Sequence, residues 1–117
     1  MTEGRERTRF CFMCRRKLVE KETHDRWVYF VWSSEAQAIK IGVTDNVKRR
    51  LSQLKNASPF PLTVLKTVRG SEIHERFLHK KFKELRTQRE WFKSTHELLE
   101  FVEGLVEGEP LLLDSLI

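Results

Sequence analysis

The chain has 117 residues, a formal net charge of +5, 33% charged residues and two cysteines. It has no apolar run of about 18 residues or more, and its first residues form no apolar core of a signal peptide, so we expect a cytoplasmic protein without a membrane span or secretory signal. This length predicts one small domain that buries a modest core without disulfides.

Charge is distributed unevenly along the sequence. Residues 97–117 contain six acidic residues and no Lys or Arg, so residues 1–96 carry a net charge of +11. A basic body of this kind suits a polyanion, because phosphate contacts from Lys and Arg supply affinity for nucleic acid of any sequence. The alternative is a basic surface that is simply solvated.

Residues 1–25 are polar and basic and show no sustained period, which predicts an N-terminal arm or a partial zinc knuckle. Cys11 and Cys14 form a Cys-x-x-Cys pair, and His24 follows. A structural zinc site takes four ligands, so Zn²⁺ would need one further group here, or a second chain supplying the other half. Ordinary reduced thiols are the alternative.

A folded domain is expected over residues 26–106. Residues 26–32 (RWVYFVW) and 38–44 (AIKIGVT) have the β-branched and aromatic composition of strands, and they should pair as an antiparallel hairpin. Residues 62–70 (LTVLKTVRG) have the same character and predict a third strand.

Three helices are expected between and after these strands. Thr44 or Asp45 can cap the first, Ser71 the second and Thr95 the third, since each offers a side-chain oxygen to a free backbone N–H. The first helix has an apolar stripe, and the second has a broad apolar face. The order of elements is β-β-α-β-α-α, which predicts an α+β fold with a small three-stranded antiparallel sheet flanked by helices.

Two segments outside these elements carry apolar residues. Residues 87–94 are expected to form a loop, in which Trp91 and Phe92 either stack on unpaired bases or pack in the core. Residues 107–117 form an acidic and apolar tail. The arm and the tail are candidates for binding a protein partner or for self-association.

Four short motifs follow one another in the expected domain. They are VYF at Val28, IKIG-x-T-x-N-x-x-x-R from Ile39, E-x-x-LH-x-x-F from Glu75, and EWF from Glu90. This order resembles the GIY-YIG endonuclease superfamily, and most closely its short phage and bacterial branch that is often labelled a DNA-binding domain. The resemblance spans about Trp27 to Phe101. It implies a three-stranded sheet with flanking helices and, in active members, phosphodiester hydrolysis with one divalent metal, Mg²⁺ or Mn²⁺.

The resemblance also implies roles for five residues. Glu75 would hold the metal, Arg50 would grip the scissile phosphate, and Tyr29 would bond the attacking water. Lys40 stands where many members carry a tyrosine; it would either activate water after losing its proton or stay charged and bind phosphate. His79 lies four residues after Glu75 on the same helix face, which indicates a catalytic or supporting role.

Further cations on the two basic helices are expected to contact nucleic acid, DNA in the first instance: Lys48, Arg49, Lys55, Lys80 and Lys81. Glu90 is a candidate second acid. Because the second family tyrosine is missing, two hypotheses stay open. One is a metal-dependent endonuclease, and the other is a nucleic-acid-binding module of the same fold without activity. A third, an interaction protein that uses the arm and the tail, has less support.

Overall fold

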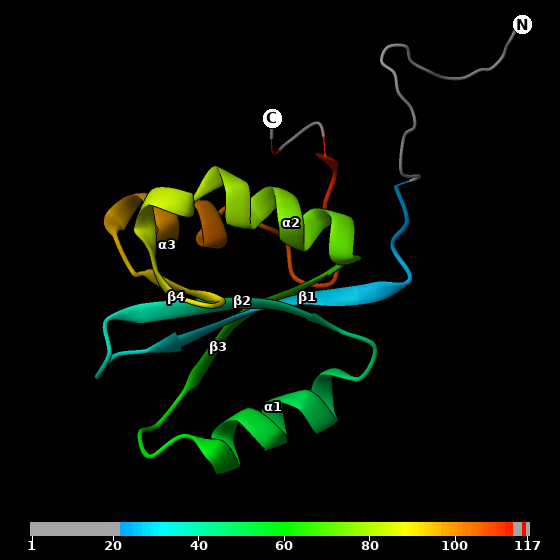
Figure 1. Cartoon of the computed structure of the whole chain (residues 1–117). Helices are drawn as coiled ribbons and strands as arrows, with labels where there is room; N and C mark the ends of the chain where they lie inside the picture. The colour runs from blue at the N-terminus through cyan, green and yellow to red at the C-terminus, as the bar shows by residue number, and fades with distance from the viewer. Residues whose placement is uncertain (1–21, 114–115, 117) are drawn as a thin grey trace, which may run out of the picture.

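The computed structural model describes residues 22–113 and 116. In chain order its elements are β1 (Arg26–Ser33), β2 (Ala38–Thr44), α1 (Val47–Ala57), β3 (Thr63–Gly70), α2 (Glu72–Lys81), a 3₁₀ turn η1 (Lys83–Leu85), β4 (Arg86–Gln88), β5 (Trp91–Lys93) and α3 (His96–Glu103). The sheet lies between two layers of helices, with α2 and α3 on one face and α1 on the other (Figure 1).

The sheet has five antiparallel strands in the order β3-β1-β2-β5-β4. The expected three-stranded sheet and the order β-β-α-β-α-α are therefore wrong. The segment 87–94, expected as a loop, supplies most of β4 and all of β5. Each of these strands is only three residues long, too short to show the alternation of apolar and polar residues by which a strand is detected.

The main core lies between the sheet and the layer of α2 and α3. Val28 and Phe30 of β1 and Ile39 and Ile41 of β2 are fully buried there. Alternate residues of a strand point to opposite faces, so Tyr29 and Lys40 point to the face that carries α1. Helix α1 has no fully buried residue, although Tyr29 on the face that it covers is only 1% exposed.

The helix starts agree with the sequence in two cases out of three. Ser71 and Thr95 occupy the N-cap positions of α2 and α3, as predicted. Helix α1 starts later than expected, because Asn46 is its cap and accepts a bond of 3.0 Å from the Arg49 backbone N–H. None of the helices in the described part of the chain is long and apolar enough to cross a membrane.

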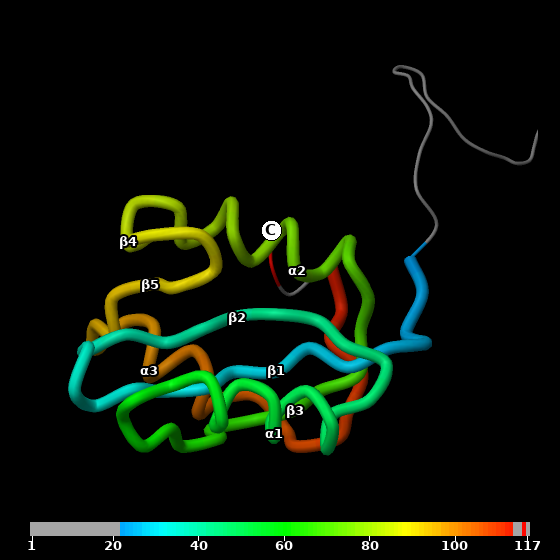
Figure 2. The backbone as a smooth tube through the Cα atoms, turned by 60° about the horizontal axis from the view of Figure 1, so that its bottom comes forward, coloured from blue at the N-terminus to red at the C-terminus, as the bar shows by residue number. Residues whose placement is uncertain are grey.

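The C-terminal segment packs on the domain beside β3. The Leu111 N–H donates to the carbonyl of Arg69 at 2.8 Å, and Arg69 forms a parallel bridge with Pro110. Leu111 and Leu116 are buried. Figure 2 shows this segment, in orange and red, passing β3 and rising toward α2. Leu111 and Leu116 of the tail thus pack on the domain's own core, while Leu112 is exposed.

Candidate functional site

The candidate site lies at the point of β2 where strand β5 stops pairing with it. Strand β5 pairs with β2 only over Ala38–Lys40. At the next residue, the Ile41 N–H donates to the Glu90 carbonyl at 3.0 Å, and Nε2 of His79 lies 3.0 Å from the Ile41 carbonyl oxygen. The turn between β4 and β5 and the helix α2 therefore meet at this point of the β2 edge.

The phenol ring of Tyr29 lies over Gly42 of the neighbouring strand β2. Tyr29 pairs with Gly42 across the β1–β2 ladder, and a Cβ placed on Gly42 would lie 2.3 Å from the phenol oxygen. Only a residue without a side chain leaves room for the phenol there. Nε of Arg50 donates to that oxygen at 3.2 Å. Burial raises the pKa of Tyr29, although Arg50 works against the rise, so Tyr29 is a neutral phenol at pH 7.

Lys40 forms an ion pair inside the site. Its Nζ lies 3.4 Å from Oε1 of Glu90 and 5.6 Å from the centre of the Trp91 ring, and the residue is 8% exposed. The same Glu90 oxygen would lie 3.0 Å from a Cβ on Gly42. Glu90 thus reaches the place where Tyr29 and Lys40 meet, and it compensates the ammonium charge of Lys40.

Glu75 is the most perturbed acid described. Burial raises its pKa to about 7, and the negative charges of Glu90 and Glu72 add to the rise, while Lys40 and Arg76 oppose it. A carboxyl group in this state lacks a sufficient positive charge beside it. Glu75 and Glu90 therefore form a pair of acids whose repulsion a further cation would relieve.

His79 supports the site from α2. A carbonyl oxygen can only accept, so Nε2 of His79 carries the proton and donates to Ile41. The ring also packs at 5.0 Å, centre to centre, from the ring of Phe92, which is fully buried in the core. In this arrangement His79 fastens α2 to the strand that carries Lys40 and Gly42.

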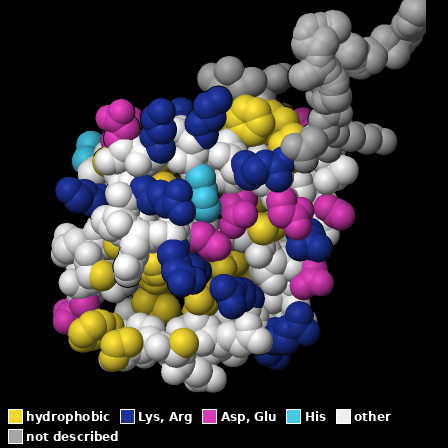
Figure 3. Space-filling model, in the orientation of Figure 1, with side chains coloured by type: hydrophobic (Ala, Val, Ile, Leu, Met, Phe, Trp, Pro, Cys, Tyr) yellow, Lys and Arg dark blue, Asp and Glu magenta, His cyan; other side chains and the backbone are white. Residues whose placement is uncertain are grey.

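Figure 3 shows one face of the molecule, in the orientation of Figure 1. Acidic and basic side chains and a histidine lie side by side across the middle of this face, and a patch of hydrophobic side chains is set back below them. This face of the molecule therefore combines charges of both signs with an apolar surface.

The cations expected to contact nucleic acid do not form one surface. Lys48, Arg49 and Lys55 are exposed on α1, where Arg49 pairs with Asp45 at 3.7 Å. Lys80 and Lys81 are exposed on α2, on the other side of the sheet (Figure 1). The two groups flank the β2 edge from opposite layers.

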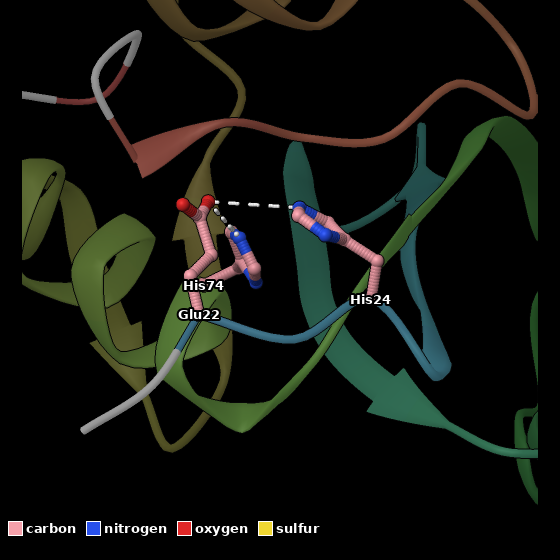
Figure 4. Close-up of side chains that lie close together, drawn as sticks. All are labelled: Glu22, His24 and His74. Atoms are coloured by element: carbon pink, nitrogen blue, oxygen red, sulfur yellow. Dashed lines mark hydrogen bonds and ion pairs between the residues drawn. The ribbon is translucent and has the colours of Figure 1, made fainter.

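A second cluster lies at the far end of β3. Nε2 of His74 is 2.8 Å from Oε2 of Glu22, and Nε2 of His24 is 3.5 Å from the same oxygen (Figure 4). The ligand atoms of these three residues all lie within 4.8 Å of one another. The sequence offered no signal for this group, because Glu22 and His74 are 52 positions apart.

Three ring nitrogens of this cluster already take part in hydrogen bonds. Nδ1 of His74 accepts from the Ser71 N–H at 3.0 Å, so its Nε2 carries the proton that bonds Glu22. Nε2 of His24 donates to the Leu111 carbonyl at 2.8 Å. A metal ion bound here would replace the protons on these nitrogens. As arranged, the cluster is a hydrogen-bonded tie. The other two residues of the predicted zinc site, Cys11 and Cys14, lie outside the described residues.

A protein-family model matches the folded domain. Residues 26–106 match the family model of the T5orf172 domain, a nuclease-like domain compatible with nucleic-acid binding. Since the match covers more than half of the chain, the protein belongs to the T5orf172 domain family. The assignment to GIY-YIG is therefore wrong, because the family model fits the whole span 26–106 while the resemblance rested on four short motifs. No curated protein and no solved structure matches the chain.

Proposed function

We propose that the chain binds DNA and hydrolyses its phosphodiester bonds with one divalent cation, Mg²⁺ or Mn²⁺. The observation that supports this most strongly is the meeting of Arg50 and Lys40 with Glu75 at the open edge of β2. A phosphodiester is anionic, so its hydrolysis needs fixed positive charge near the phosphoryl oxygens and a group that holds a metal-bound water.

Arg50 and Lys40 would hold the phosphate. The bond from Nε of Arg50 to Tyr29 fixes the plane of the guanidinium group, and such a group is a charged fork suited to phosphate oxygens. Lys40 is held by Glu90 from the adjacent turn. Arrival of a phosphate would give Lys40 a second anionic partner without moving the strand.

Glu75 is the residue that would hold the cation, with Glu90 as a second oxygen donor. Mg²⁺ binds through one or two carboxylates and keeps several waters, so this donor set fits. Burial first, and the charges of Glu90 and Glu72 second, raise the pKa of Glu75. This supports the assignment, because a nearby cation would stabilise the ionised carboxylate against both effects. When bound, such a cation polarises the phosphoryl oxygens and lowers the pKa of a coordinated water.

Tyr29 and His79 would have supporting roles. As a neutral phenol, Tyr29 can donate to a phosphate oxygen or to the attacking water, and it orients Arg50. His79 already donates to Ile41, so its contribution is to position β2 against α2. The apolar packing of Phe92 behind it holds the ring in place.

A second candidate is a DNA-binding module without activity. It is favoured by the fact that Tyr29 is neutral, Lys40 is paired with Glu90, and Nε2 of His79 is a donor, so none of the three offers an evident general base. Both candidates use the same phosphate-binding groups, and only the cleavage reaction separates them.

DNA binding is tested by fluorescence anisotropy over a series of salt concentrations. Arg50→Ala should weaken binding and reduce the slope of log affinity against log salt by about 1. Arg50→Lys keeps the charge and so should keep the slope, yet it should still bind more weakly because the planar fork is gone. Binding that is unchanged in both variants, or that does not depend on salt, would contradict the assignment of Arg50.

A further inference from the structure

An apolar pocket borders the proposed phosphate site on the α1 side of the sheet. It has a volume of about 240 Å³, and its walls include Trp91, Phe60, Leu62 and Ala38. Phe60 lies in the loop after α1 and is 48% exposed. Phe60 and the partly buried Trp91 give this pocket an aromatic wall that a flat ligand could cover.

Trp91 is shared by the pocket and the phosphate site. It pairs with Lys40 across the β2–β5 ladder, and Nζ of Lys40 lies 5.6 Å from the centre of its ring. Trp91 therefore lies between the pocket and the ammonium group of Lys40. A ligand that places an anionic group at Lys40 would carry its next group over Trp91.

The hydroxyl groups around the pocket are used locally. Oγ of Ser33 accepts from the Ala36 N–H, Oγ of Ser58 bonds the backbone of Phe60, and Oγ1 of Thr87 donates to the Trp91 carbonyl. The pocket thus presents mainly flat aromatic and apolar surface. Lys93 follows Trp91 by two residues on β5, so it lies on the same face of the sheet, and it is exposed.

We propose that this pocket binds an unpaired nucleobase of the DNA strand whose phosphate lies at Lys40 and Arg50. The proposal rests on the proposed function and specifies its substrate as single-stranded or locally unpaired DNA. A flat π surface beside fixed cations matches a nucleotide, which has a planar base next to an anionic group. Stacking accepts every base, so the pocket should show little preference among the four.

The test compares two oligonucleotides of equal length, one of thymidines and one of abasic sites. The wild-type chain should bind the thymidine strand about 5- to 150-fold more tightly, which is the range of one stacked base. Phe60→Ala should remove most of this difference and leave the affinity for the abasic strand unchanged. Because Phe60 is half exposed, this variant should fold. Trp91→Leu, which keeps apolar bulk without the π face, should act in the same direction.

Val106→Ala is the matched control, since Val106 is 64% exposed and does not line this pocket. It should leave both affinities unchanged. Equal binding of the two strands by the wild type, or an equal loss for both strands in Phe60→Ala, would overturn the base pocket. If Arg50→Ala still weakens binding in that case, the phosphate site stands without the pocket. Failure of the wild type to bind either strand or duplex DNA would overturn both proposals.

Discussion

At the scale of single residues, the site depends on the burial of charged groups. Glu75 and Glu90 place two carboxyl groups near the ammonium of Lys40, and the guanidinium of Arg50 is bonded to the neutral Tyr29. At neutral pH, Glu75 is about half protonated because its pKa lies at about 7. Proton and cation therefore compete for the same carboxylate.

This competition predicts a pH-dependent effect of Glu75→Gln on stability. The folded pKa of Glu75 is raised from 4.5 to about 7, so the neutral form stabilises the fold below pH 4.5 and this contribution is lost as the pH rises through 7. Glu75→Gln has no ionisable group at this position, so it does not lose this contribution as the pH rises. Between pH 5 and pH 8, the free energy of unfolding of the variant should therefore rise relative to that of wild type by on the order of 1 kcal/mol. This value is reduced for solvent screening of a partly exposed group.

The measurement is urea unfolding of both proteins at the two pH values without divalent cations. A difference between the proteins that is the same at pH 5 and pH 8 would contradict the raised pKa. Addition of Mn²⁺ at pH 8 should stabilise the wild type and leave the variant unaffected, because a ligand that binds only the folded state raises its stability.

Several features of the site follow from the order of motifs in the sequence. Tyr29, Lys40, Arg50 and Glu75 come from β1, β2, α1 and α2, and the structure places them together. The bond from His79 to Ile41 could not be predicted, because it depends on where β5 stops pairing with β2. The chemical roles of Tyr29, Lys40, Arg50 and Glu75 stay predictions.

At the scale of elements, the hairpin β4–β5 has the largest effect on the site. It carries Glu90 and Trp91, and its turn holds Arg89 at a φ of 50°, a conformation that side chains rarely adopt. Sequence patterns could not reveal it, since β4 is exposed at all three residues and reads as polar loop. Pairing with β2 gives these short strands their structure.

The close approach of β1 and β2 at Tyr29 predicts a large effect of Gly42→Ala. The added methyl group would lie 2.3 Å from the phenol oxygen, so either Tyr29 or the strand must shift, at a cost of about 1–3 kcal/mol in the free energy of unfolding. Displacement of Tyr29 would also release Arg50 and weaken DNA binding. Both quantities can be measured, by urea unfolding and by anisotropy.

Gly104→Ala is the matched control for this substitution. Gly104 ends α3 in a right-handed helical conformation, with a φ of −74°, and its new methyl group would have no neighbour closer than 3.5 Å. This variant should be neutral or more stable by up to about 1 kcal/mol. Similar changes in the two variants would show that the contact with Tyr29 is not the cause.

At the scale of the whole molecule, the two ends of the described chain are tied together. His24 donates to the Leu111 carbonyl, and the Leu113 N–H donates to Glu22, which also accepts from His74 at the start of α2. Residues on either side of the family match at 26–106 thus contact each other and the domain. Sequence patterns gave no basis for this tie, because the partners of Glu22 are 52 and 91 positions away.

The docked tail predicts a clear difference between two neighbouring leucines. Leu111 is 3% exposed and Leu112 is 52% exposed. Leu111→Ala should lower the free energy of unfolding by about 2–4 kcal/mol because it leaves a cavity beside β3. Leu112→Ala should change it by less than about 1 kcal/mol. Equal, small losses in urea unfolding would mean that the tail contributes nothing to the stability of the domain.

The most direct test of the account is a plasmid nicking time course in Mg²⁺ or Mn²⁺ with three proteins: wild type, Glu75→Gln and, as a control, Glu97→Gln on the exposed side of α3. Wild type and control should nick at the same rate, and Glu75→Gln should be slower by about 100-fold or more, since even partners of metal ligands contribute 10- to 100-fold. All three should bind DNA. Cleavage that persists unchanged in Glu75→Gln would contradict the account, and binding without cleavage by the wild type would leave only the binding module.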